Sequence, residues 1–278
     1  MKRKLIGKED FWNVHPAFKG VFGNLLIKMI SSIGGINKVN AVYDGSKHEP
    51  TGLGFTIDLL DRQAIIREVE NIETLDELQG QPFITVSNHP YGHIDGIMAI
   101  SVVAAKRLDY KMMVNWMLNH VDIMSEHFIG VNPYNKDTKM ATLHSSVSGI
   151  KQCLEHLHDG HPLGLFPAGS VSFPHWNRKP EDREWQPTVL KLIKKAKVPV
   201  IPMYISGNNS KFYQFLGLIN WRIRMFRLLH EVTNKRGKTV HIRFGKPISV
   251  EEQSKFNDIE AFGKFLKETT YALKCKGD

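Results

Sequence analysis

Apolar residues in this 278-residue chain occur in two patterns, short continuous runs and positions at helical spacing. Together these patterns predict short strands alternating with amphipathic helices. Apolar runs bounded by glycine, proline or polar residues predict strands, some with an exit turn, over residues 65–69, 83–87, 110–114, 128–133, 162–172, 198–205 and 239–244. Apolar positions at helical spacing predict helices over residues 18–33, 54–62, 95–105, 116–120, 138–158, 189–196 and 250–273. The polar residues 36–51 are expected to be irregular.

This order of elements predicts an α/β fold with a mainly parallel or mixed sheet flanked by helices. An N-terminal amphipathic helical segment, a candidate for membrane association, is expected over residues 1–50, and the α/β domain over residues 51–278. A chain of this length can bury a sizeable core.

The first predicted helix has an apolar stripe whose role the sequence leaves open. The stripe consists of Phe18, Val21, Phe22, Leu25, Leu26, Met29, Ile30 and Ile33. It either packs against the protein core or lies on a bilayer, where the flanking Lys19 and Lys28 would meet anionic lipid.

The strand over residues 83–87 leads into a corner that holds two candidate chemical groups. Pro90 and Gly92 force a turn after the strand, and Asp95 opens the next helix, so His89 and Asp95 lie at a strand-to-helix corner. Open α/β folds place their ligand crevices at the carboxyl ends of strands. Two later strands also end in polar corners, at residues 169–172 and 206–210, and are expected to line the same crevice.

Charge and cysteine content limit the kinds of partner and the cellular compartment that the protein is expected to have. A net charge of +9 implies an acidic partner, which leaves nucleic acid, an anionic membrane surface and an acidic substrate carrier open. Cys153 and Cys275 lie far apart without metal-ligand spacing, which favours a reduced, cytosolic setting. The basic N-terminus lacks the apolar core of a secretory signal, and no run of 18 apolar residues predicts a membrane-spanning helix.

Several short blocks follow one another in a specific order. Asn88-His89 and Asp95-Gly96 are followed by Phe166-Pro167-Ala168-Gly169 and then by Val200-Ile201-Pro202. The chain thereby resembles the glycerolipid and lysophospholipid acyltransferase superfamily, and most closely its bacterial lyso-ornithine and glycine-lipid (hemolysin-like) acyltransferases. The likeness extends from Ile65 to Ile248.

The resemblance implies an O-acyltransferase that moves a fatty acyl group from a thioester of acyl carrier protein or coenzyme A to the hydroxyl of a lyso-lipid. It implies no cofactor, no metal and no nucleic-acid partner, and a peripheral position on the anionic cytoplasmic face of the inner membrane. It assigns catalysis to His89 and Asp95, and substrate binding to Asn88, Gly92, Phe166, Pro167, Ala168, Gly169 and Ser170.

Three departures from the superfamily pattern bear on the substrate and the site. Five residues separate His89 from Asp95 where the superfamily usually has four. Ala168 stands where the superfamily usually has a glutamate that helps bind phosphate head groups, so a lyso-aminolipid is favoured over lysophosphatidic acid. A further block that contacts the glycerol phosphate is replaced at best by residues 130–134.

The side chains at the corner suit this chemistry. A neutral imidazole can take a hydroxyl proton at cytosolic pH, which is the role expected for His89. The carboxylate of Asp95 would fix the ring tautomer and stabilise the imidazolium. Backbone N–H groups at Gly169-Ser170 or at the start of the Asp95 helix would stabilise the oxyanion.

Other hypotheses compete with this one. His93 could join His89 and Asp95 in a metal site, and Ser170 could act as a nucleophile, although it lacks a Gly-x-Ser-x-Gly elbow. The Trp- and Arg-rich stretch 216–232 suits a membrane interface, single-stranded nucleic acid or a plain solvated helix. The alternative function is therefore a non-catalytic basic module that binds an anionic membrane or nucleic acid.

Overall fold

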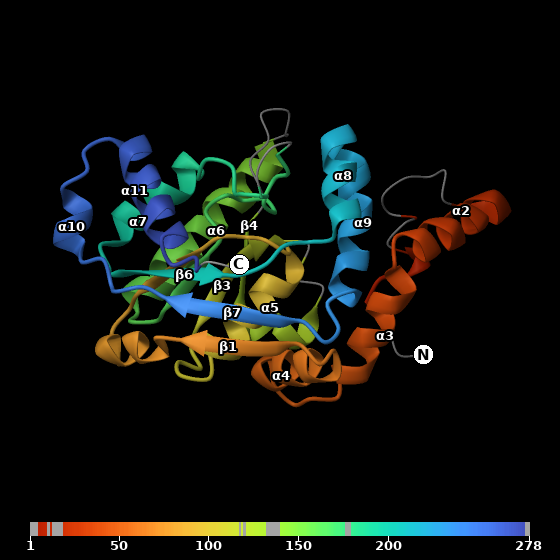
Figure 1. Ribbon diagram of the computed structural model, residues 1–278, viewed down its shortest axis with the longest axis horizontal. Coiled ribbons are helices and arrows are strands. Elements are labelled where there is room, and N and C mark those ends of the chain that lie inside the picture. The colour runs from red at the N-terminus through yellow and green to blue at the C-terminus, as the bar shows by residue number, and fades with distance from the viewer. Residues whose placement is uncertain are drawn as a thin grey trace.

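The computed structural model describes residues 5–9, 12, 19–116, 118, 121–131, 140–175 and 179–275. They form a seven-stranded sheet with the strand order β1-β7-β6-β2-β5-β3-β4 (Figure 1). All neighbouring strands are parallel except β6 and β7. The strands are β1 (Ile66–Glu70), β2 (Ile84–Ser87), β3 (Lys111–Asn115), β4 (Phe128–Val131), β5 (Leu163–Leu165), β6 (Val200–Ile205) and β7 (Thr239–Phe244).

Helices cover both faces of the sheet, which confirms the predicted α/β fold with a mixed sheet. Side chains of α4 and α5 pack on one face, and side chains of α6, α7 and α11 pack on the other. The α-helices are α2 (Gly20–Ile33), α3 (Ile36–Ser46), α4 (Gly52–Arg62), α5 (His93–Val103), α6 (Met140–His158), α7 (Pro187–Ala196), α8 (Lys211–Ile219), α9 (Trp221–Thr233), α10 (Val250–Ser254) and α11 (Ile259–Tyr271), with 3₁₀ helices at η2 (Ile72–Leu78) and η4 (Asp122–His127).

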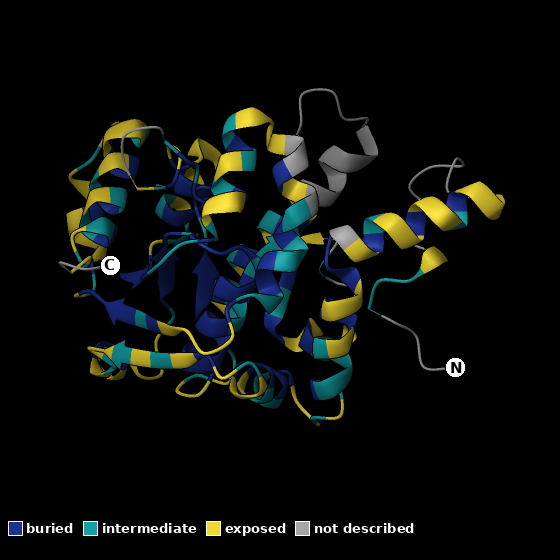
Figure 2. Ribbon diagram, turned by 45° about the vertical axis from the view of Figure 1, so that its right-hand side comes forward, coloured by how far each residue is buried: buried dark blue, intermediate teal, exposed yellow. Residues whose placement is uncertain are grey.

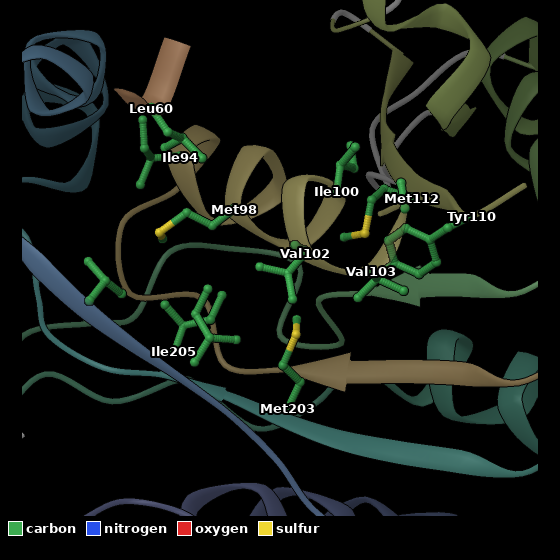
Figure 3. Close-up of a cluster of buried hydrophobic side chains, with 14 of the residues drawn as sticks. Leu60, Ile94, Met98, Ile100, Val102, Val103, Tyr110, Met112, Met203 and Ile205 are labelled. Carbon is green, nitrogen blue, oxygen red and sulfur yellow. The ribbon is translucent and has the colours of Figure 1, made fainter. Parts of the chain in front are cut away.

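The central strands are buried on both faces. Every residue of β2 and β6 is buried, as expected where helices cover a parallel sheet on both sides. Val102 of α5 points toward Met203 of β6 in the core, and Met98 of α5 belongs to the same cluster (Figure 3). This packing fixes α5, and with it the corner between β2 and α5.

The prediction that residues 36–51 are irregular was wrong, because α3 occupies Ile36–Ser46. Gly35 adopts a left-handed φ of 77° before the helix, and Val39 and Asn40 are buried within it. The Asn40 side chain exchanges two hydrogen bonds, of 3.0 and 2.9 Å, with the backbone of Ile6. Packing against α2, α4 and α9 outweighs the weak helix propensity of this stretch.

Two predicted helices are each divided in two. The stretch 216–232 spans parts of α8 and α9, because Asn220 adopts an extended conformation between them. The terminal stretch 250–273 is divided into α10 and α11, because Asp258 caps a new helix by accepting a hydrogen bond from the backbone of Ala261 at 2.8 Å.

Helix α2 projects from the body of the protein and exposes most of its apolar stripe (Figures 1 and 2). Phe22 is 88% exposed and Leu25 65% exposed, whereas Ile27 is buried. Among the described residues, no helix is both long and apolar enough to cross a membrane. The boundary between residues 50 and 51 stays a prediction.

Most other predicted elements agree with the structure within a few residues. Four predictions fall partly outside the described residues, namely those at Phe18, at residues 116–120, at residues 132–134 after β4, and at residues 138–139 before α6.

Candidate active site

The corner between β2 and α5 requires glycine at position 92. Gly92 has φ 94° and ψ −122°, a backbone conformation that side chains with a Cβ rarely adopt. A Cβ at this position would lie 3.0 Å from Leu228 Cδ1 and 3.2 Å from Val171 Cγ2. Close packing and backbone shape therefore both select glycine here.

The two predicted catalytic residues meet at this corner. His89 Nδ1 lies 2.8 Å from Asp95 Oδ2, although the ring N–H does not point along the line to that oxygen. Catalytic contacts of this kind are often poorly aligned without substrate. The Asp95 side chain is fully buried, whereas the His89 side chain is 17% exposed, so the imidazole reaches the surface and the carboxylate does not.

The backbone of the turn holds Asp95 in place. Its Oδ2 atom accepts hydrogen bonds from the backbone N–H groups of Tyr91 at 2.9 Å and Gly92 at 2.8 Å. A carboxylate in the first turn is also stabilised by the helix dipole of α5. The extra residue between His89 and Asp95 is thus accommodated in a turn whose own N–H groups orient the aspartate.

Phe166 covers one face of the histidine. The two rings are stacked, with centroids 4.2 Å apart and planes 19° from parallel. Phe166 directly follows β5, which is a neighbour of β2 in the sheet. The expected meeting of the β2 and β5 corners is therefore found, and Phe166 restricts the ring orientation of His89.

The corner after Phe166 is a tight turn against α7. Gly169 has φ 64°, and a Cβ on it would lie 1.8 Å from Gln186 Nε2. Gln186 binds this turn by donating its side chain to the Ala168 carbonyl at 3.3 Å and its backbone N–H to the Pro167 carbonyl at 2.9 Å. Ala168 is buried, while Gly169 and Ser170 are exposed.

Asn88 connects two strands. Its amide nitrogen donates to the Ile205 carbonyl and its amide oxygen accepts from the Ile205 N–H, both at 2.8 Å. The side chain is buried, so these contacts join the carboxyl end of β2 to that of β6. The expected role of Asn88 in substrate binding stays a prediction.

His93 is the first residue of α5 and lies near His89. Burial lowers the pKa of His93 to about 4, and the nearby His89 adds to this effect. Its buried Nδ1 atom has no hydrogen-bond partner among the described residues. The described residues contain no group of three histidine, cysteine or acidic side chains placed to hold a metal ion.

Asp182 is a site residue that the sequence did not reveal. It is 3% exposed, and its Oδ1 atom accepts hydrogen bonds from the His89 N–H at 3.2 Å and from Ser172 Oγ at 2.7 Å. Asp182 belongs to the charged run Glu181-Asp182-Arg183-Glu184, which has the composition of a solvated loop. Nothing in that pattern distinguishes the one buried carboxylate.

Arg224 is buried, although each of the three roles considered for the stretch 216–232 would expose its arginines. It is 4% exposed, and its guanidinium donates to the carbonyls of Val171 at 3.0 Å and Ser172 at 2.7 Å. It also lies over the Tyr213 ring, 4.6 Å from the centroid. Arg224 therefore binds the segment beside His89, while Trp221 and Met225 of the same helix are exposed.

Two known proteins are similar in sequence to this chain. The chain is 26% identical over 248 residues to the lyso-glycine lipid O-acyltransferase of Bacteroides thetaiotaomicron, covering 85% of each chain. It is 28% identical over 216 residues to the protein of the same name from Phocaeicola vulgatus, covering 74% of this chain and 72% of that one.

A solved structure has a similar fold. The crystal structure of the 1-acyl-sn-glycerophosphate (LPA) acyltransferase PlsC from Thermotoga maritima superposes with a TM-score of 0.50, at 16% identity, over 90% of this chain and 94% of that one. The model of the acyltransferase family matches residues 56–278, which include the β2–α5 corner, the Phe166–Ser170 turn and Asp182. The chain therefore belongs to the acyltransferase family.

Proposed function

We propose that this protein transfers a fatty acyl group from a thioester to the hydroxyl of a lyso-lipid, with His89 as general base. The neutral imidazole takes the proton of the acceptor hydroxyl, and the hydroxyl oxygen attacks the thioester carbonyl. When the tetrahedral intermediate collapses, the carbon–sulfur bond breaks and the imidazolium returns the proton to the departing thiolate. No covalent enzyme intermediate is needed.

The observation that carries this proposal is the contact between His89 and Asp95. A buried carboxylate held by two backbone N–H groups cannot move away from the ring, so it fixes the orientation of the imidazole and stabilises its protonated form. In the exposed Gly169-Ser170 turn the Gly169 N–H donates to the Phe166 carbonyl at 2.9 Å, so the Ser170 N–H is the candidate donor to the oxyanion. One such donor contributes about 3 kcal/mol to transition-state stabilisation.

A lyso-aminolipid is the acceptor that we favour. The names of the two curated relatives support a lyso-glycine lipid or a related molecule. The buried methyl group of Ala168 brings neither a charge nor a hydrogen-bond donor to the turn where the wider superfamily has a carboxylate. Acyl carrier protein and coenzyme A are both acidic, and the net charge of +9 suits either thioester donor.

A peripheral position on the anionic cytoplasmic face of the inner membrane completes the proposal. The exposed apolar side chains of α2 and of the α8–α9 pair support it, namely Val21, Phe22, Leu25, Leu26, Met29, Phe212, Phe215, Ile219, Trp221 and Met225. Such side chains bind the boundary between headgroups and acyl chains.

The test is acyl transfer by the purified protein. Palmitoyl-coenzyme A and palmitoyl-acyl carrier protein are each offered with lyso-glycine lipid, lyso-ornithine lipid and lysophosphatidic acid, and the products are identified by mass spectrometry. We expect a diacylated product with a lyso-aminolipid, and none with the His89→Ala variant. No product with any pair would refute acyl transfer, and a strong preference for lysophosphatidic acid would refute the proposed acceptor.

A further inference from the structure

The segment that follows the Phe166–Ser170 turn binds both backbone polar groups of His89. The Ser172 N–H donates to the His89 carbonyl at 2.8 Å, and the His89 N–H donates to Asp182 Oδ1 at 3.2 Å. The Ser172 hydroxyl donates to the same Asp182 oxygen at 2.7 Å. Asp182 and Ser172 thus form a clamp on the backbone of His89, although both are more than 80 residues away in sequence.

Among the described residues, the hydrogen-bond donors to the buried Asp182 carboxylate are neutral groups. Oδ1 accepts from the His89 N–H and from Ser172 Oγ, and Oδ2 accepts from Trp185 Nε1 at 3.3 Å. Burial raises the pKa of Asp182, and the Ser172 hydroxyl and the nearby His89 oppose part of that rise. Burying a carboxylate without a cationic partner is unfavourable, so these hydrogen bonds must offset that cost.

Neighbouring helices make the clamp rigid. Residues Phe173 and Glu181 pair across an antiparallel bridge, which brings Asp182 back to Ser172. Helix α11 contacts Asp182 through Tyr271, whose hydroxyl oxygen accepts from the Asp182 N–H at 2.8 Å, and through Lys267, which donates to the Asp182 carbonyl at 2.7 Å. On the other side, Arg224 of α9 binds the carbonyl of Ser172.

We propose that Asp182 is a positioning residue that acts through His89. By accepting from the His89 N–H and from Ser172 Oγ, it sets the backbone from which the imidazole reaches Asp95 and stacks on Phe166. This inference rests on the proposed role of His89 as base. Displacement of a catalytic group by about 1 Å can reduce the rate on the order of 100-fold. Holding the His89 backbone in place can therefore offset the unfavourable free energy of burying the Asp182 carboxylate.

The experiment compares three variants by steady-state kinetics of thiol release from palmitoyl-coenzyme A with lyso-glycine lipid. Asp182→Ala removes both acceptors and should lower kcat on the order of 100-fold with KM for both substrates within about twofold. Asp182→Asn keeps one acceptor oxygen and should recover kcat to within about tenfold of wild type. Ser172→Ala keeps both hydrogen bonds to the His89 backbone and loses only the hydroxyl that donates to Asp182, so it should lower kcat by much less than Asp182→Ala.

Gln253→Ala is the matched control. It removes a buried side chain that donates to the carbonyls of Val198 at 2.9 Å and Ile248 at 3.1 Å, so it should lower the melting temperature. Because these contacts lie at the amino end of β6, away from His89, kcat should stay within about twofold. The proposal is overturned if Asp182→Ala loses no more kcat than Gln253→Ala. It is also overturned if Asp182→Asn is as slow as Asp182→Ala, because the charge rather than the hydrogen bond would then matter.

A spectroscopic measurement separates this inference from the proposed function. The ring resonances of His89, assigned with His89→Gln in histidine-labelled protein, should shift or broaden in Ser172→Ala and Asp182→Asn and stay unchanged in Gln253→Ala. Unchanged resonances in the first two variants would overturn the positioning role, whether or not the protein transfers acyl groups. A wild-type protein without transferase activity would overturn the proposed function alone.

Discussion

At the scale of single residues, we propose that His89 and Asp95 act as one functional unit. His89→Ala should remove nearly all turnover, and Asp95→Asn should remove a large part, because an amide favours the wrong imidazole tautomer. The double variant should be little slower than His89→Ala, since groups that act together are not additive. Acyl transfer is measured for all three variants, with circular dichroism as the folding control. A fully active, folded His89→Ala protein would contradict the mechanism.

His93 affects stability at acidic pH. Its pKa is lowered to about 4 in the folded protein from 6.5 in the unfolded chain, so the unfolded state binds more protons between these values. Stability should therefore fall as the pH decreases from 6.5 to 4, by at most about 3 kcal/mol from this residue.

Removing the His93 side chain should remove that part of the pH dependence. Urea unfolding at pH 7 and pH 4.5 should show a smaller difference in the free energy of unfolding for His93→Gln than for the wild type. His158→Gln is the control, because the His158 side chain is 92% exposed. An equal pH difference in His93→Gln and the wild type would show that His93 is not held neutral.

At the scale of elements, α8 and α9 are joined by a buried charge network. Glu231 accepts from the backbone N–H and the hydroxyl of Ser210, at 2.9 and 2.7 Å, and from Lys235 Nζ at 2.7 Å. Burial lowers the pKa of Lys235, and the hydrogen bond with Glu231 opposes this. The network holds the start of α8 against the end of α9, beside Tyr91.

Breaking this buried pair should be costly. Lys235→Met should lower the free energy of unfolding by about 3–5 kcal/mol, because it leaves the buried Glu231 carboxylate without its cation. Glu231→Gln combined with Lys235→Met should cost less than Lys235→Met alone. Lys264→Met is the control, since Lys264 and Glu268 form an exposed pair and should contribute less than about 1 kcal/mol. Similar losses in both lysine variants would contradict the importance of burial.

The elements also show what sequence can and cannot predict. The strand β6 was recognisable because it is a continuous apolar run, and β2 because its residues are β-branched or small. The β2–α5 corner was recognisable because Pro90 and Gly92 interrupt the pattern. Helix α3 was missed because tertiary contacts of Val39 and Asn40 stabilise it. The burial of Asp182 and Arg224 was not predicted, because charged side chains are usually exposed and only the fold shows that these two are enclosed. His89 and Asp95 were found because they lie close in sequence.

At the scale of the whole molecule, one side of the fold has apolar side chains that the described residues do not cover. Helix α2 extends from the body with Val21, Phe22 and Leu25 exposed, and lysines flank this stripe at positions 19 and 28 (Figure 2). A surface of this composition binds anionic lipid through both apolar burial and charge attraction.

Vesicle binding tests this surface. The protein should sediment with anionic vesicles and less with neutral ones, and binding should weaken as salt rises, because salt screens the attraction to lipid headgroups. Phe22→Glu with Leu25→Glu should reduce binding at least about tenfold, since burying one large apolar side chain contributes about 1.5–3 kcal/mol. Leu108→Glu is the control. Leu108 is 72% exposed, but it follows the carboxyl end of α5, whereas His89 precedes the amino end of that helix. Equal losses of vesicle binding in the α2 double variant and in Leu108→Glu would show that α2 does not contact lipid. The exposed apolar side chains of α2 would then require a protein partner.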